Sequence, residues 1–256
     1  MNRLTKLFSE KQSEILNIYF TAGYPKIDDT VDIIRALTQE GVDLIELGVP
    51  YSDPMADGPT IQNSSSVALK NGMTLHTLFG QVAESRQHSQ VPIILMGYYN
   101  QMMQYGIERF LRSCQQSGVD GLIIPDLPMS IYKRDYQELF GQYDLKIAFL
   151  ITPETSDERI ILADELSSAF IYVVSKSSIT GSANTIDQDQ KAYFHRIDQL
   201  HLKTPRLIGF GIHDRDTYLT ACDNSNGAII GSAFIRALNT AEDLTARITQ
   251  FVGTIR

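Results

Sequence analysis

Short apolar runs alternate with amphipathic segments along most of the chain. Apolar residues at Val31, Ile34 and Leu37 have the spacing of one face of a helix. The apolar runs that are short enough to be strands cover residues 16–20, 43–47, 93–96, 121–124, 147–151, 170–174, 206–208 and 227–230. The pattern therefore predicts strands and helices in regular alternation.

The number of these repeats favours a closed barrel. Eight strand candidates in 256 residues give about 32 residues per unit, the length of a strand–helix repeat. We expect an α/β protein in which residues 1–256 form a single (β/α)8 TIM-barrel domain, with an extra N-terminal helix over residues 2–11 that plugs the barrel floor. An open doubly wound sheet is the alternative. It would carry a Gly-x-Gly-x-x-Gly turn after the first strand, and residues 20–25 do not form one.

Composition and charge narrow the class of partner. The chain is 43% hydrophobic and 20% charged, as in an ordinary globular protein with a large core. Its formal net charge of −8 argues against nucleic acid or an anionic membrane as partner, because no global positive field attracts them. An anionic ligand would have to be held by local donors.

The sequence carries no signal of secretion. Its two cysteines, Cys114 and Cys222, are too few and too far apart for a disulfide framework. The first apolar run is too short for the core of a signal peptide, and no run approaches the roughly 20 residues of a membrane span. We therefore expect a cytoplasmic protein.

The second strand candidate carries a charge inside its apolar run. Glu46 lies between Leu44, Ile45 and Leu47. A buried charge is costly unless it is paired or used. Burial also raises a carboxyl pKa toward neutrality, so that the group can both donate and accept a proton. The alternative is a structural glutamate that is paired with a lysine or arginine.

A second carboxylate follows in the loop after this strand. Asp57 could face Glu46 across a pocket, so that two carboxylates have different environments. The segment also suits a simple turn into a helix with Pro59 at its first position. Asp53, which precedes Pro54, has the same two interpretations.

Three glycine-bearing loops follow the last three strand candidates, at residues 179–182, 209–212 and 231–234. In a barrel, such loops and the N-terminus of a short helix bind phosphate through backbone N–H groups, without net positive charge. Each glycine alone could serve only a turn. Together they predict a phosphate site.

Other catalytic arrangements are not indicated. No Gly-x-Ser-x-Gly elbow or Walker loop is present, and none of the five histidines has metal-ligand spacing, so we expect no metal. Lys176 could be a Schiff-base lysine, but it lies in a serine-rich loop where solvent would keep its pKa high.

Residues 44–62 closely resemble the signature of the tryptophan synthase α-subunit family. The resemblance continues at residues 20–25, 118–121, 126–128, 172–175, 180–181, 209–212 and 231–233, and so spans nearly the whole chain. It implies a (β/α)8 lyase of tryptophan biosynthesis that cleaves indole-3-glycerol phosphate into indole and glyceraldehyde 3-phosphate and needs no cofactor.

The resemblance also implies roles for individual residues. Glu46 would be the catalytic acid/base and Asp57 its partner. The substrate would be bound by Tyr172 on the pocket floor, by Tyr19 and Thr21 on the indole side, and by Gly181, Gly211, Gly231 and Ser232 around the phosphate.

A partner is implied as well, a β subunit in a complex of two α and two β subunits. The residues that would face it are Pro50, Asp53, Pro54, Asn100 and Pro128. The loops after strands two and six would form a lid. Where the family usually has arginine and glycine in the strand-six loop, this chain has Lys176 and Ser178, and lysine loses bidentate reach. These departures concern lid closure more than cleavage.

Three other functions fit the same residues. They are a stand-alone indole-releasing lyase, a non-catalytic activator of a β subunit, and another barrel acting on a phosphorylated sugar, such as an isomerase. The retained Glu46 and Asp57 argue against a non-catalytic role, because a lost site has no use for a buried charge.

Overall fold

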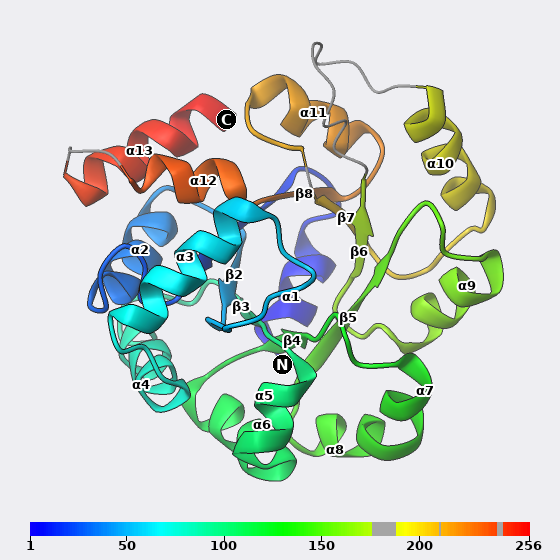
Figure 1. Ribbon diagram of the computed structural model, residues 1–256. Coiled ribbons are helices and arrows are strands. Elements are labelled where there is room, and N and C mark those ends of the chain that lie inside the picture. The colour runs from blue at the N-terminus through cyan, green and yellow to red at the C-terminus, as the bar shows by residue number, and fades with distance from the viewer. Residues whose placement is uncertain (176–187, 210, 240–242) are drawn as a thin grey trace.

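Eight parallel strands close into a barrel in chain order, and β8 pairs back onto β1. The computed structural model describes residues 1–175, 188–209, 211–239 and 243–256. Helices surround the strands in a ring (Figure 1). The predicted (β/α)8 barrel is confirmed, and the open doubly wound sheet is excluded by the closure between β8 and β1.

Every predicted strand is present, within one residue at either end. The strands are β1 (Ile15–Thr21), β2 (Leu44–Gly48), β3 (Ile93–Met96), β4 (Gly121–Ile123), β5 (Lys146–Ile151), β6 (Ile171–Val174), β7 (Arg206–Gly209) and β8 (Gly227–Ile230).

The helices that follow the strands cover the outside of the barrel. They are α2 (Asp29–Gln39), α3 (Pro59–Lys70), α4 (Leu75–Ser85), α5 (Tyr99–Tyr105), α6 (Ile107–Ser117), α7 (Met129–Ile131), the π-helical segment η1 (Tyr132–Tyr136), α8 (Gln137–Gln142), α9 (Asp157–Leu166), α10 (Gln188–Gln199), α11 (Arg215–Asp223), α12 (Ser232–Ala237) and α13 (Leu244–Ile255). No helix in these described ranges combines the length and the apolar character that a membrane span requires.

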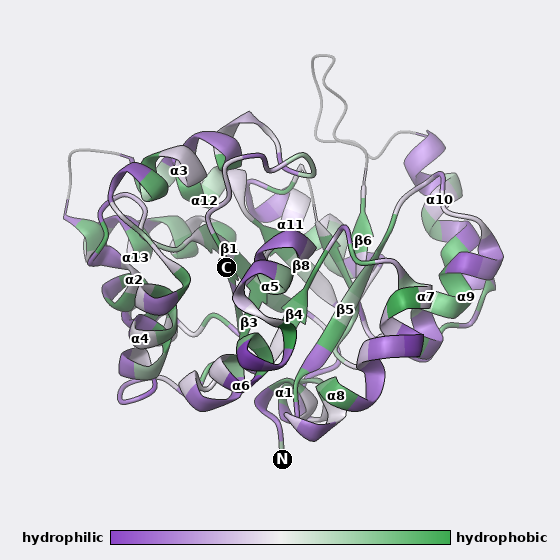
Figure 2. Ribbon diagram, turned by 60° about the horizontal axis from the view of Figure 1, so that its bottom comes forward, coloured by the Kyte–Doolittle hydropathy of each residue, from purple (hydrophilic) through white to green (hydrophobic). Residues whose placement is uncertain are grey.

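Side chains alternate between two apolar layers. On β2, Leu44 belongs to the cluster inside the barrel, whereas Ile45 and Leu47 belong to the cluster between strands and helices. Both faces of a strand are therefore buried, which is why the strands are nearly continuous apolar runs. Figure 2 shows the strands as mostly hydrophobic, surrounded by helices in which hydrophobic and hydrophilic residues alternate.

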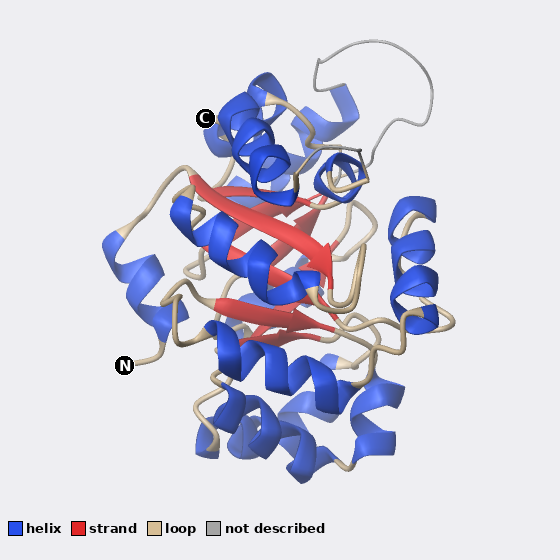
Figure 3. Cartoon of the chain, turned by 90° about the vertical axis from the view of Figure 1, so that its left-hand side faces the viewer, coloured by secondary structure: helices blue, strands red, loops and turns tan. Residues whose placement is uncertain are grey.

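The predicted N-terminal helix closes the barrel floor. This helix, α1 (Arg3–Glu10), lies at one end of the strands (Figure 3). Its buried Leu4 and Phe8 join the cluster inside the barrel, and the side chain of Asn2 caps it by accepting a hydrogen bond from the Leu4 N–H. Burial of each large apolar side chain stabilises the fold by about 1.5–3 kcal/mol.

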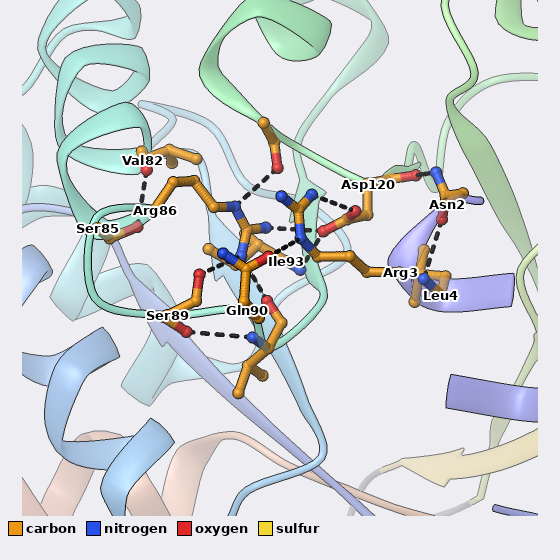
Figure 4. Close-up of polar contacts among 12 residues, drawn as sticks. Asn2, Arg3, Leu4, Val82, Ser85, Arg86, Ser89, Gln90, Ile93 and Asp120 are labelled. Carbon is orange, nitrogen blue, oxygen red and sulfur yellow. Dashed lines mark hydrogen bonds and ion pairs between the residues drawn. The ribbon is translucent and has the colours of Figure 1, made fainter. Parts of the chain in front are cut away.

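A buried carboxylate holds α1 to the floor. Asp120 precedes β4 and is only 2% exposed. One of its oxygens accepts from Arg3 at 3.0 Å, and the other accepts from Arg86 at 2.7 Å and from the Ile93 N–H at 2.9 Å (Figure 4). Asp120 thereby links α1, α4, β3 and β4 through charge-assisted hydrogen bonds.

Candidate active site

Glu46 points into the barrel. It lies two residues after the inward-facing Leu44, and strand side chains alternate between faces. Its register partners are Tyr19 on β1 and Ile94 on β3. The side chain is 0% exposed, and Oε2 accepts a hydrogen bond of 3.1 Å from Asn17 Nδ2. Within the described ranges, Oε1 has no hydrogen-bond partner and no lysine or arginine pairs with the carboxylate.

This environment changes the proton affinity of Glu46. Burial raises its pKa to about 8; the hydrogen bond from Asn17 opposes the rise, and the negative charge of Asp57 adds to it. The group is therefore mostly protonated at neutral pH. Its pKa is still close enough to neutral pH for the group to give up and regain a proton during a reaction.

Asp57 faces the same interior from the loop after β2. Its Oδ2 accepts a hydrogen bond of 3.0 Å from the hydroxyl of Tyr98, which in turn accepts from the Ala56 N–H. Burial raises the pKa of Asp57, and the hydrogen bond from Tyr98 opposes the rise. The turn interpretation of this segment also holds, because Pro59 begins α3.

Two buried tyrosines flank the carboxyl pair. Burial raises the pKa of Tyr19 on β1 and of Tyr172 on β6, and the charges of Glu46 and Asp57 raise both further. Gly48 and Gly209 leave room for the two rings, since a Cβ at either position would collide with a tyrosine hydroxyl. The four predicted side chains therefore share one region inside the barrel.

Thr21 has a structural partner in the same region. It is fully buried at the end of β1, and its hydroxyl lies 2.7 Å from the hydroxyl of Ser64 on α3. It therefore joins the strand to the helix that follows the Asp57 loop.

The predicted phosphate glycines are at the carboxyl ends of the last strands. Gly211 follows β7 and has a φ of 78°, a conformation that favours glycine. Gly231 precedes α12, whose first residue is Ser232. A Cβ on Gly231 would lie 3.3 Å from the Tyr19 ring, so this loop adjoins the carboxyl pair. Gly181, with Lys176 and Ser178, lies outside the described residues.

The predicted partner-facing residues lie in the loops after β2, β3 and β4. Asp53, Asn100 and Pro128 are exposed, whereas Pro50 and Pro54 are buried. The Asn100 amide donates to the Tyr51 hydroxyl at 3.2 Å and so connects two of these loops. The five residues belong to the same end of the barrel as the carboxyl pair.

Two neighbours of the carboxylates were missed from the sequence. Asn17 interrupts the apolar run of β1, and this interruption was the available signal. Tyr98, two residues after β3, had no such signal, because a tyrosine is ordinary beside an apolar strand. In the described ranges, no three His, Cys, Asp or Glu side chains are grouped so that they could hold a metal ion.

Comparison with known proteins identifies the family. The family model described as tryptophan synthase alpha chain matches residues 5–254. The chain belongs to this family. Alpha chains from Christiangramia forsetii and Flavobacterium johnsoniae are each 52% identical to it over 256 residues, covering 100% of this chain and 99% and 100% of theirs.

Solved structures of the family have the same fold. The tryptophan synthase A-subunit of Pyrococcus furiosus superposes with a TM-score of 0.87 at 34% identity, over 96% of this chain and 98% of that one. A tryptophan synthase chain of Mycobacterium tuberculosis gives a TM-score of 0.88 at 28% identity, over 99% and 96% of the two chains.

Proposed function

We propose that this protein is a lyase of tryptophan biosynthesis that cleaves indole-3-glycerol phosphate into indole and glyceraldehyde 3-phosphate, as the α subunit of tryptophan synthase. The observation that carries the proposal is the state of Glu46: fully buried inside the barrel, with one oxygen unpartnered among the described residues and a pKa of about 8. Membership of the family supports the same substrate.

Glu46 supplies both proton transfers in this proposal. Indole is a poor carbanion leaving group, so the protonated Glu46 first gives its proton to C3 of the ring. The side-chain hydroxyl then gives its proton to the Glu46 carboxylate. As it does so, the O–H electrons form the aldehyde, and the electrons of the broken C–C bond restore the indole ring. Glu46 ends the cycle protonated, as it began.

Asp57 stabilises the charge that appears between these transfers. Protonation of C3 places positive charge on the ring N–H, and a fixed carboxylate beside it lowers the free energy of that state. The hydrogen bond from Tyr98 holds Asp57 in place and favours its ionised form. Tyr19 and Tyr172 provide the apolar walls for the ring.

The phosphate anchors the other end of the substrate. The proposed donors are the backbone N–H groups around Gly181, Gly211, Gly231 and Ser232, at a helix N-terminus. Binding energy at this remote group orients the bond to be broken and so contributes to the rate.

The proposal extends to the organisation of the protein. Residues 1–256 act as one barrel domain in the cytoplasm, and the loops that carry Pro50, Asp53, Pro54, Asn100 and Pro128 bind a β subunit. The exposure of three of these residues and the match to the family over residues 5–254 support this.

The test is indole release from indole-3-glycerol phosphate, measured with and without a β subunit. A slow reaction that accelerates on addition of the β subunit is expected. Equal rates in both conditions would indicate a stand-alone lyase. Release by neither preparation, together with stimulation of the β subunit, would indicate a non-catalytic activator and overturn the proposal.

A further inference from the structure

Asn17 is a buried polar residue to which the cleavage chemistry assigns no part. It lies on β1 between Leu16 and Ile18 and is 0% exposed. Its Nδ2 donates to Glu46 Oε2 at 3.1 Å, and its Oδ1 has no hydrogen-bond partner among the described residues. An amide held inside an apolar barrel costs free energy unless it is used.

We propose that Asn17 is a positioning residue that holds the Glu46 carboxyl group in both of its protonation states, so that Oε1 stays directed at the substrate. The proposal rests on the proposed function for its catalytic meaning, and on the contact between the two buried side chains for its physical basis.

The chemistry of an amide suits this task. Its NH2 group donates to a carboxylate, and its carbonyl oxygen accepts from a carboxylic acid. Half a turn of the Asn17 amide exchanges these two groups at the Glu46 oxygen. A residue that alternates between acid and base needs such a neighbour, whereas a lysine would hold Glu46 ionised and a leucine would leave it without a partner.

The other titratable groups that face Glu46 cannot replace Asn17. Asp57 carries a like charge and raises the pKa of Glu46. The charge of Glu46 raises the pKa of Tyr19 on β1 and of Tyr172 on β6, so neither phenol supplies a charge that could offset that of the carboxylate. The register partner on β3 is the apolar Ile94. Asn17 thus gives the one described hydrogen bond to this carboxyl group.

The pKa of Glu46 is to be measured in the full chain by 13C NMR of glutamate labelled at the side-chain carboxyl carbon. The Glu46 resonance is identified by its absence in Glu46→Gln. Because the hydrogen bond to the charged carboxylate is stronger than the one from the neutral acid, the loss of both in Asn17→Leu should raise the pKa by about one unit or more. Asn17→Asp should raise it too, since it adds a negative charge.

Ile229→Val is the matched control. Ile229 is the register partner of Asn17 on β8, so this change loosens packing beside Asn17 without altering the hydrogen bond. The pKa of Glu46 should not move in it. An unchanged midpoint in Asn17→Leu, or an equal shift in Ile229→Val, would overturn the proposal.

A measurement on the unmodified protein covers the case in which Asn17→Leu does not fold. The side-chain 15N resonance of Asn17 should titrate with the midpoint of Glu46 and should stop doing so in Glu46→Gln. An Asn17 side-chain 15N chemical shift that does not change with pH around this midpoint would overturn the proposal. These titrations need no substrate, so they can succeed or fail whether or not the protein releases indole.

Catalysis gives a third readout. If Glu46 must begin protonated, kcat/KM falls above its pKa. Asn17→Leu should then move this alkaline limb to higher pH by the same amount as the NMR midpoint. A residue with a purely structural role would lower the rate at all pH values and leave the limb where it was.

Discussion

Glu46 and Asp120 are both buried carboxylates, one inside the barrel facing its mouth and the other at its floor. Both oxygens of Asp120 have partners, supplied by Arg3, Arg86 and the Ile93 N–H. Glu46 has one amide on one oxygen. Burial alone therefore does not mark a functional acid; the partners of the buried group do.

The two sites also affect their surroundings differently. At the floor, burial lowers the pKa of Arg86 to about 10, and the negative charge of Asp120 opposes this, so Arg86 stays ionised at neutral pH. Inside the barrel no described cation offsets burial, and the proton remains on Glu46. The floor therefore contains a fixed ion pair between Arg86 and Asp120, whereas Glu46 inside the barrel carries a proton that it can transfer.

The largest expected effect comes from Glu46→Gln, which removes the mobile proton and keeps the shape. Cleavage of indole-3-glycerol phosphate should fall by about 10⁴-fold, the upper end for general acid–base catalysis, because one group serves both transfers. Steady-state assays of indole release measure this. Binding of a phosphate ligand should be largely intact, and turnover comparable to that of the unmodified protein would refute the assignment.

Asp120→Asn tests the other half of the comparison. Removal of this charge leaves Arg86, whose side chain is 11% exposed, without its counter-ion. Removal of one partner of a buried ion pair typically costs about 3–5 kcal/mol of stability. Urea denaturation measures the loss. Activity per folded molecule should be nearly unchanged, and a variant that stays stable but loses turnover would show that the floor takes part in catalysis.

The sequence predicted the fold better than the contacts. Period and spacing were enough for all eight strands and for α1, because each strand is buried on both faces and must be apolar. Glu46 stood out for the same reason, as a charge where none is expected. Asp120 did not stand out, because it lies at the boundary between a helix and a strand, where polar residues are ordinary. Its structural role depends on an ion pair with Arg3, which is 117 positions away in the sequence.

Most of the contacts that the sequence did not predict are hydrogen bonds between residues far apart in the chain. The hydroxyl of Tyr98 reaches Asp57 from 41 positions away, and Asn17 reaches Glu46 from 29. Such pairs depend on register between strands and on loop geometry, and a single sequence fixes neither. The roles given to Gly211, Gly231 and Ser232 remain predictions, as they depend on a bound phosphate.

Asp57→Asn is expected to have the next largest effect, a loss of turnover smaller than that in Glu46→Gln. The amide keeps the contact with Tyr98 but cannot stabilise a positive charge on the ring nitrogen, so kcat should fall by about 10²-fold or more with little change in KM. Steady-state kinetics with indole-3-glycerol phosphate separate the two constants. A rise in KM alone would make Asp57 a substrate-binding residue and contradict its role in stabilising the transition state.

The smallest expected effect is on the pH dependence of stability, and it tests whether Glu46 carries a proton in the folded protein. The pKa of Glu46 is about 8 in the folded protein and about 4.5 when unperturbed, as in the unfolded chain, so between these values the folded protein binds a proton that the unfolded chain has released. Stability from this group is therefore present at low pH and is lost as pH rises toward 8.

Glutamine does not titrate. The stability of Glu46→Gln relative to the unmodified protein should grow by about 2–3 kcal/mol between pH 6 and pH 9, since each pKa unit corresponds to about 1.4 kcal/mol. Urea denaturation of both proteins at several pH values measures the difference. Parallel stability curves would mean that Glu46 is already ionised at pH 6, and the proton that the reaction needs would have to come from another group.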